Sequence, residues 1–304
     1  MQTLCVSGVG APDVVRELAD RLSDAGRVAI VDYTPDSTID EPVAAPDKPT
    51  PAATTAIRVA ADGTWVGHGT DQSPMNLLDS LATDYDYALI AGFRHHRLPV
   101  VLIGNAAGES GGDTKTATGS DTVAAAGDTV AAAGDTADAA TAANVVATAE
   151  SADEVDLDAL RERLDESEPH ITLDTLVERA KGSPLAERSG AIATFTGRVR
   201  TKDSADDART EQLTFEKYAG VAAERMDAIS AELAERDGVF DVHMHHRVGT
   251  MRSGEDIVFV VVLAGHREEA FRTVEDGINR LKDEVPIFKK ETTEADEFWL
   301  HEKA

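Results

Sequence analysis

The pattern of apolar runs along the chain changes near residue 168, and this change limits the possible fold more than any other feature. Before it, the stretch PDVVRELADRLSDAG predicts a helix that begins at Pro12 and stops at Gly26. Near-continuous apolar runs predict buried strands at LCVSGVG, RVAIVDY, YALIAGF, LPVVLIGN and NVVATA. With DLDALRERLDE as a closing helix, residues 1–166 are expected to form an α/β domain around a parallel sheet.

The second part of the chain, residues 168–304, has longer helices and different strand spacing. Amphipathic helices are predicted for GVAAERMDAISAELAERDG and HREEAFRTVEDGINRLKDEV, and Pro286 stops the second. Strands are predicted for GAIATFTGRV, EQLTFEKY, VFDVHMHHRVG and DIVFVVVLAG, with TMRSGE as the turn between the last two. Strands grouped around two long helices indicate an α+β domain with a mainly antiparallel sheet.

A low-complexity segment interrupts the first domain. Residues 106–143 are rich in Ala, Asp, Thr and Gly and repeat a seven-residue unit, as in DTVAAAGDTVAAAG. No large apolar residue recurs to form a coiled-coil seam, and Gly127 and Gly134 break any helix. Because alanine buries too little surface to offset the entropy of ordering, we expect a disordered insert.

The chain has a formal net charge of −27, which limits its partners. Nucleic acids and anionic membranes bind basic faces, so neither is an expected partner. The acidic residues are spread along the whole chain. This distribution fits an acidic interaction surface or, as we favour, adaptation to high salt.

Cys5 is the only cysteine, so neither an intrachain disulfide nor a cluster of thiolates around zinc is possible. It lies in the apolar run TLCVSG, which is typical of a buried side chain. The sequence has no signal-peptide pattern and no run of 18 apolar residues. We therefore expect a soluble, cytoplasmic protein.

A glycine turn, GVGAPDVV (residues 8–15), joins the first strand to the first helix, where a phosphate-binding loop would stand. A P-loop requires a second glycine, then Lys and Ser or Thr, at fixed offsets. Those offsets hold Asp13, Val14 and Val15, and an aspartate repels phosphate. A nucleotide site and a structural turn are the two interpretations, and the missing lysine favours the turn.

The glycine turn, the stretch YDYALIAGFRHHRLPVVLIGN and the late strand NVVATAES occur in an order that resembles a known family. It is the MobB type of P-loop-fold adaptor protein in molybdopterin-guanine dinucleotide biosynthesis. The resemblance covers residues 1–105 and 144–166, and Ala91 stands where that family has glutamate. It implies a degenerate, P-loop-like α/β domain of the same pathway, without the nucleotide site.

Basic groups gather at strand and helix ends in the second domain. Arg198 and Arg200 in FTGRVR end a strand and share a face by alternation. His266 and Arg267 begin a helix, where a positive charge opposes the helix dipole. An ideal wheel places Arg267 on the apolar stripe formed by Phe271, Val274, Ile278, Leu281 and Val285. The pattern indicates an anion pocket, or else an arginine that caps the edge of the core.

The stretch LKDEVPIFKKE concentrates lysines in a chain that otherwise has few. Lys282 lies at the flank of the apolar stripe, and Lys289 and Lys290 follow Pro286 in an extended segment. Alternation sends these two to opposite faces, so one of them can join Lys282. A partly desolvated lysine near other cations has a lowered pKa and can shuttle protons or attack an electrophile. Scattered, solvated lysines are the alternative.

The histidines of HMHHR raise the question of a metal. His243 and His245 share a strand face, but two ligands do not close a site. Ordinary strand histidines are therefore favoured over a metal centre.

Five stretches together resemble the large, catalytic subunit of molybdopterin synthase, the MoaE family. They are FTGRVR, LTFEKYAGVAAERM, HHRVGTMRSGEDIVFVVVLAGHREEAF, INRLKDEVPIFKKE and EFWLHEKA, they occur in order, and the match runs from about residue 168 to the end. The resemblance implies an α+β domain of that type. It also implies conversion of cyclic pyranopterin monophosphate to molybdopterin. The sulfur comes from the C-terminal Gly-Gly thiocarboxylate of a small ubiquitin-like (MoaD-type) subunit. A homodimer, hence a heterotetramer with the small subunit, is implied, and no cofactor.

The resemblance also implies roles for individual residues. Lys282 and Lys289 match the essential lysines, and Arg200, His266 and Arg267 match residues that bind the substrate anion, partly from the dimer mate. Pocket positions are also expected at Phe195, Lys290 and Glu291, and Phe288 stands where the family usually has tryptophan. Two alternatives remain: a non-catalytic docking module for a ubiquitin-like protein, and a nucleotide-dependent cofactor adaptor.

Overall fold

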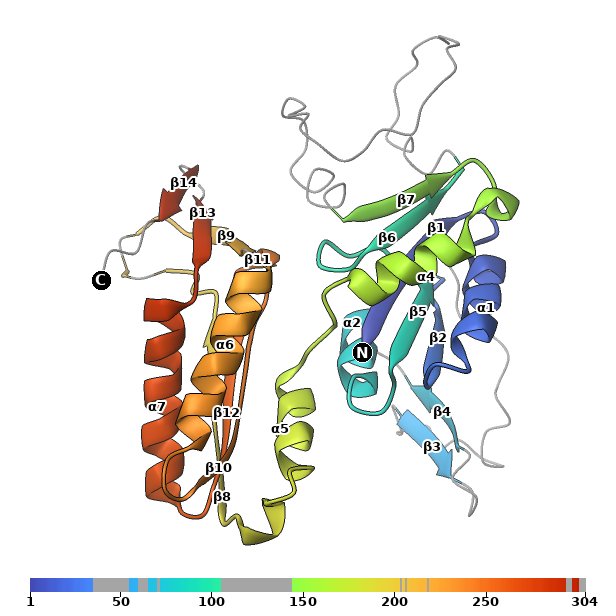
Figure 1. The fold of residues 1–304 in the computed structure, drawn as a ribbon. Coiled ribbons are helices and arrows are strands. Elements are labelled where there is room, and N and C mark those ends of the chain that lie inside the picture. Colours follow the sequence, from blue (N-terminus) through green and yellow to red (C-terminus); the bar gives the residue numbers. More distant parts are fainter. Residues whose placement is uncertain are drawn as a thin grey trace. The chain divides into compact units, whose positions relative to one another are not determined.

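The structure is a computed structural model, and it describes residues 1–34, 55–59, 65–69, 72–104, 144–202, 204–205, 207–217, 219–293 and 297–300. The insert expected over residues 106–143 lies outside them. The chain divides into two compact units. The N-terminal unit comprises residues 1–141 and 145–168, and the C-terminal unit comprises residues 142–144 and 169–304. Figure 1 shows the ribbon of both.

The N-terminal unit is built on a five-stranded sheet with the order β2-β5-β1-β6-β7, in which all neighbours are parallel. The predicted strands and helices of this part of the chain are confirmed. An antiparallel hairpin, β3-β4, and helix α2 were not predicted. The strands are β1 (Gln2–Gly8), β2 (Val28–Asp32), β3 (Thr55–Val59), β4 (Trp65–Gly69), β5 (Tyr87–Ala91), β6 (Val100–Ile103) and β7 (Val145–Ala149). The helices are α1 (Ala11–Leu22), α2 (Pro74–Leu81), η1 (Ala152–Glu154) and α4 (Leu157–Glu166).

Both faces of this parallel sheet are buried, which explains why its strands are almost entirely apolar. Leu4 and Val6 of β1 pack on one face with residues of α1 and α4. Cys5, between them, packs on the other face with Leu78 of α2. Burial raises the pKa of the Cys5 thiol to about 12, as expected for a small apolar side chain in the core.

The C-terminal unit contains two antiparallel sheets. Their orders are β10-β12-β8 and β11-β9-β13-β14. The antiparallel prediction is confirmed, but the expectation of one sheet is wrong. The strands are β8 (Ala191–Arg198), β9 (Thr210–Lys217), β10 (Val239–His246), β11 (Gly249–Arg252), β12 (Asp256–Ala264), β13 (Ile287–Thr293) and β14 (Glu297–Leu300). The helices are α5 (Leu173–Lys181), η2 (Ala186–Arg188), α6 (Ala219–Ala234) and α7 (Arg267–Glu284).

The stretch TMRSGE is not simply the turn that was predicted. Its first residues lie in β11, which pairs with β9 in the second sheet instead of extending the β10-β12 hairpin. Gly249 and Gly254 have φ angles of 82° and 87°, a left-handed conformation that lets the chain leave and rejoin the first sheet. This excursion ties the two sheets together.

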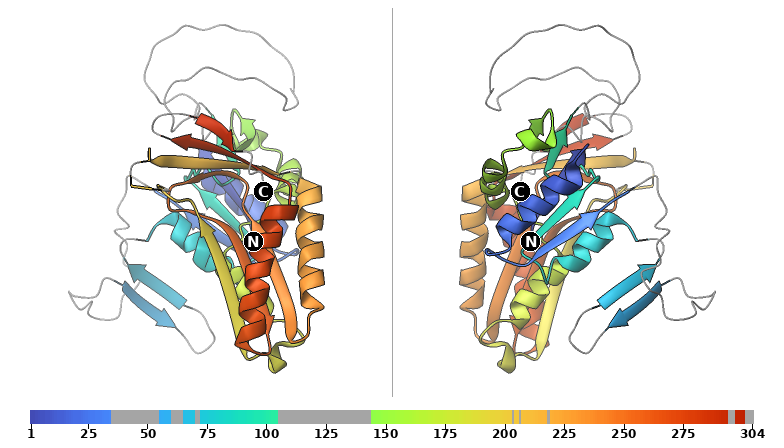
Figure 2. Two further views of the ribbon diagram at one scale, coloured as in Figure 1. Left: turned by 90° about the vertical axis from the view of Figure 1, so that its left-hand side faces the viewer. Right: turned by 90° about the vertical axis from the view of Figure 1, so that its right-hand side faces the viewer.

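Two layers of helix enclose the first sheet of the C-terminal unit. Helices α6 and α7 run side by side and pack on one face through a core that includes Ile229, Val260 and Ile278 (Figure 2). Helix α5 covers the opposite face through Leu176, against Phe259 and other residues of β12. A smaller cluster, Val199, Leu213, Phe215 and Met251, forms the core under the second sheet.

Helix α7 packs through most of the apolar stripe that an ideal wheel predicts, because Ile278, Leu281 and Val285 are buried and Val274 packs against the same core. The N-terminal end of the stripe is the exception. Phe271 is 64% exposed, and Arg267 is exposed as well. At Gly277 the helix lies close to β10 and β12, because a Cβ there would be 3.0 Å from Met244 and Val260. Close approach at Gly277 turns Phe271 and Arg267 outward. At 18 residues α7 is the longest helix described, and none of the described helices is long and apolar enough to cross a membrane.

Candidate functional site

The glycine turn of the N-terminal unit is built for packing. Gly8 has φ 124°, and a Cβ there would lie 2.0 Å from the Ile103 carbonyl oxygen, so only glycine fits. Val14 and Val15, which occupy the positions of the P-loop lysine and hydroxyl, are buried in the core. Asp13 forms an ion pair with Arg16 at 2.7 Å. These contacts support the structural interpretation of the turn.

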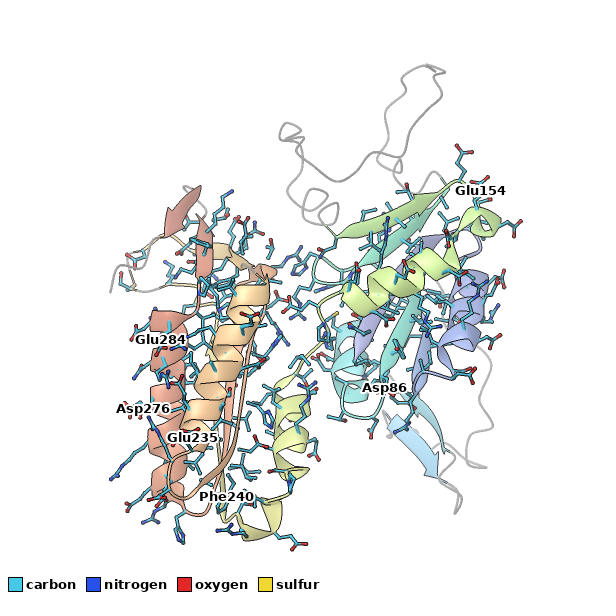
Figure 3. The ribbon with its side chains drawn as sticks, viewed as in Figure 1. Asp86, Glu154, Glu235, Phe240, Asp276 and Glu284 are labelled. Carbon is cyan, nitrogen blue, oxygen red and sulfur yellow. The ribbon has the colours of Figure 1, made fainter. Side chains whose placement is uncertain are left out.

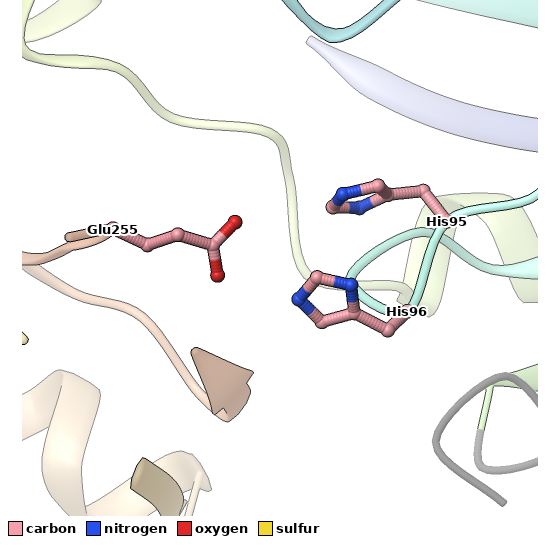
Figure 4. Close-up of side chains that lie close together, drawn as sticks. All are labelled: His95, His96 and Glu255. Atoms are coloured by element: carbon pink, nitrogen blue, oxygen red, sulfur yellow. The ribbon is translucent and has the colours of Figure 1, made fainter. Parts of the chain in front are cut away.

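A second polar group of this unit lies on the loop after β5. The rings of His95 and His96 are adjacent, with centroids 4.2 Å apart (Figure 4). Phe93 stacks on His95, and Arg94 Nε donates a hydrogen bond to Ser7 Oγ at 2.9 Å. The loop therefore packs against the carboxyl end of β1.

In the C-terminal unit, Lys282 lies in the last turn of α7 with an exposed side chain. The helix ends at Glu284, and the Val285 N–H donates to the Leu281 carbonyl before Pro286 turns the chain into β13. A cation in the last turn is favoured by the helix dipole, so Lys282 is placed without strain.

Strand β13 carries the other two lysines and confirms their predicted alternation. Lys289 pairs with buried Phe215 of β9, whereas Lys290 pairs with Thr214. Lys289 therefore shares the apolar face of the sheet, and Lys290 shares the polar face, on which Thr214 and Thr250 are hydrogen-bonded at 3.1 Å. Both lysines are half-buried.

Hydrogen bonds join the Arg200 loop to β13. Arg200 follows the end of β8, and the next residue, Thr201, accepts a hydrogen bond from the Thr210 N–H at 2.8 Å. The Thr210 hydroxyl in turn donates to Glu291 Oε1. Arg200 and Glu291 are thus carried by segments that Thr210 holds together.

His266 and Arg267 lie at the opposite end of α7 from Lys282. His266 is the N-cap residue, without a side-chain capping bond, and Arg267 is the first helical residue. Fifteen residues separate Arg267 from Lys282, which corresponds to about 22 Å along the helix axis. Within one chain, the predicted anion-binding pair and the predicted catalytic lysines are not brought together.

Phe195 and the strand histidines have packing roles. Phe195 lies in the middle of β8, paired with Val260, and packs half-buried against the main core of the unit. His243 Nε2 is 3.3 Å from the Asp241 carboxylate, and His245 stacks on Phe259. His243 therefore lies beside an acidic side chain, and His245 lies against an aromatic ring.

Comparison with known proteins identifies the family of the chain. The MoaE protein family matches residues 167–284. The chain is 50% identical over 303 residues to a probable molybdopterin synthase of Haloferax volcanii, covering 100% of both chains. It is 33% identical over 127 residues to the molybdopterin synthase catalytic subunit of Pyrococcus abyssi, covering 42% of this chain and 84% of that one. A solved molybdopterin synthase from Staphylococcus aureus is 31% identical with a TM-score of 0.39, covering 44% of this chain and 93% of that one. The chain belongs to the MoaE family of molybdopterin synthase catalytic subunits.

Proposed function

We propose that the chemistry of this enzyme takes place at the carboxyl end of α7, with Lys282 as the proton donor and acceptor and Lys289 as the residue that orients the sulfur donor. The chain is a sulfurtransferase of molybdenum cofactor biosynthesis. The observation that carries the proposal is the short connection from Lys282, in the last turn of α7, to β13, on which Lys289 and Glu291 share one face. Hydrogen bonds of Thr210 tie Glu291 to the loop that carries Arg200.

The charges of these residues match the proposed reactants. Cyclic pyranopterin monophosphate carries a phosphate, and the tail of the small ubiquitin-like subunit ends in a thiocarboxylate. Both are anions, which a chain of net charge −27 would otherwise repel. Arg200 and Lys289 supply the positive charge that binds them, and Lys282 moves the protons that ring opening and sulfur transfer require.

His266 and Arg267 enter the site from a second copy of the chain. Their separation of about 22 Å from Lys282 along α7 excludes a shared pocket within one chain, whereas a two-fold dimer presents the start of one α7 to the end of another. Exposed apolar side chains support a dimer surface, since Phe271 of α7 is 64% exposed and Ile192 of β8 is 37% exposed. With one small subunit per copy, the assembly is a heterotetramer.

The remaining assignments are proposals of the same kind. Lys290 and Phe195 are expected to support the pocket without contacting the reacting atoms. Lys290 lies on the opposite face of β13 from Lys289, and Phe195 packs against the core. Residues 1–166 form a MobB-like domain without a working P-loop, and the location is cytoplasmic.

Substitution of Lys282 tests the proposal. Lys282→Ala is expected to lower molybdopterin formation about a hundredfold or more, because a positioned acid/base contributes that much. The assay combines the purified chain, its thiocarboxylated small subunit and cyclic pyranopterin monophosphate. Lys181→Ala is the matched control, since Lys181 is an exposed helical lysine that pairs with Glu178. Wild-type turnover by Lys282→Ala would refute the role of Lys282.

A further inference from the structure

A β-bulge in β9 turns Thr210 onto the face of the proposed site. Thr292 of β13 pairs with Gln212, but the next residue, Thr293, pairs with Thr210, so Glu211 is the extra residue. In a regular strand Thr210 would share the polar face of Gln212. Past the bulge it lies opposite Thr293, on the face that also carries Glu291.

The bulge is fixed by hydrogen bonds from the neighbouring chain segments. The Ser253 N–H donates to the carbonyl of the extra residue, Glu211, at 2.9 Å. The hydroxyl of Ser253 is hydrogen-bonded to that of Thr201, and the Thr201 carbonyl accepts from the Thr210 N–H. The register shift is therefore anchored on both sides, and bulges are over-represented next to active sites.

From these contacts we propose that Thr210 is a positioning residue for sulfur transfer, an inference that rests on the proposed function. Its side chain is only 8% exposed, and its hydroxyl donates to Oε1 of Glu291. This bond fixes one oxygen of the Glu291 carboxylate, on the strand face that also carries Lys289. The Thr210 backbone at the same time holds the loop that carries Arg200.

The physical reason for a threonine is the combination of shape and donor. A β-branched side chain suits the strand, and its hydroxyl makes a hydrogen bond to a charged group, which is stronger than one between neutral groups. Thr210→Val keeps the shape and removes the donor, whereas Thr210→Ser keeps the donor. The pair of variants separates positioning from packing.

The experiment measures kcat and KM for both variants, for Glu291→Gln and for the double variant Thr210→Val with Glu291→Gln. We expect Thr210→Val to lower kcat about tenfold with KM for cyclic pyranopterin monophosphate nearly unchanged, and Thr210→Ser to stay within about twofold of wild type. The double variant should be no worse than Glu291→Gln alone, because the two residues act as a unit.

Wild-type kcat for Thr210→Val, an equal loss for Thr210→Ser, or additive losses in the double variant would each overturn the inference. Thermal unfolding of every variant separates a positioning effect from lost stability. An impaired Glu291→Gln beside an unimpaired Thr210→Val defeats this inference alone. Wild-type activity of both Glu291→Gln and Lys282→Ala defeats the proposed site as well.

Discussion

Helices α1 and α7 begin in the same way but with opposite consequences. Each follows a central strand of its sheet, and each lacks a side-chain cap, in contrast to α2, α4 and α5, which Ser73, Asp156 and Thr172 cap. The start of α1 carries Asp13, which the helix dipole favours, and α7 starts with Arg267, which it does not. The first turn packs into the core, whereas the second holds an exposed Arg267 beside Glu268 and Glu269, and we propose that Arg267 is kept there to bind an anion.

The largest effect is expected at the packed turn. Gly8→Ala places a Cβ 2.0 Å from the Ile103 carbonyl oxygen at φ 124°, so we expect it to destabilise the N-terminal unit by about 3 kcal/mol or more. Chemical unfolding measures the loss. Gly220→Ala, in α6 with nothing within 4 Å of the new Cβ, should be neutral or slightly stabilising. A tolerated Gly8→Ala would mean that the turn moves freely, and the contrast with α7 would fail.

The next largest effect is expected at Arg267, and it should appear in activity instead of in stability. Arg267→Ala should lower kcat/KM about a hundredfold, while thermal stability stays equal or rises slightly because an unfavourable dipole interaction is removed. Arg272→Ala is the control, since Arg272 is exposed on the same helix and makes a long ion pair, 3.9 Å, with exposed Glu268. Lost stability with retained kcat/KM would show that Arg267 is structural, like the residues of the α1 turn.

The smallest effect concerns the outer faces of the two units. Arg21 links α1 to Asp158 of α4 by one ion pair, whereas Arg225 and Arg280 join α6 and α7 in a network with Glu232 and Glu284. Glu284 is the last residue of α7, and Asp276, which pairs with Arg236, lies nearer the start of the helix (Figure 3). Among the described residues, the α6-α7 pair of the C-terminal unit is therefore joined by charge across its exposed side.

The pairing of Glu232 with Arg280 therefore predicts a contribution to folding stability that is lost at acid pH. The hydrogen bond from Arg280 lowers the pKa of the Glu232 carboxyl. A lowered pKa means that the stabilisation is present above the ordinary value of about 4.3 and is lost as the pH falls through the lower, folded value. Glu232→Gln should therefore lower the unfolding temperature slightly at pH 7 and not at all well below pH 4. An equal loss at both pH values would contradict the ion-pair origin.

The sequence predicts most of the long elements of both units, because their apolar runs are local patterns, but α2, α5 and the β3-β4 hairpin were missed. It also fails where structure depends on distant partners. Strand β11 was missed because it pairs with β9, some 35 residues earlier, and the wheel misplaced Phe271 because α7 lies close to β10 and β12 at Gly277. The lysines stand out as a charge anomaly in an acidic chain. Thr210 has no such signal, since a bulge at Glu211 is visible only once β9 and β13 are paired.

Subunit complementation tests the central claim most directly. Lys282→Ala and Arg267→Ala chains, carrying different tags, are produced together, and the mixed dimer is purified through both tags. If each site joins Lys282 of one chain to Arg267 of the other, one of the two sites is intact, and the mixed dimer recovers about half the wild-type activity. Each parent dimer stays nearly inactive. A mixed dimer as inactive as its parents, or the absence of a dimer, would contradict the account.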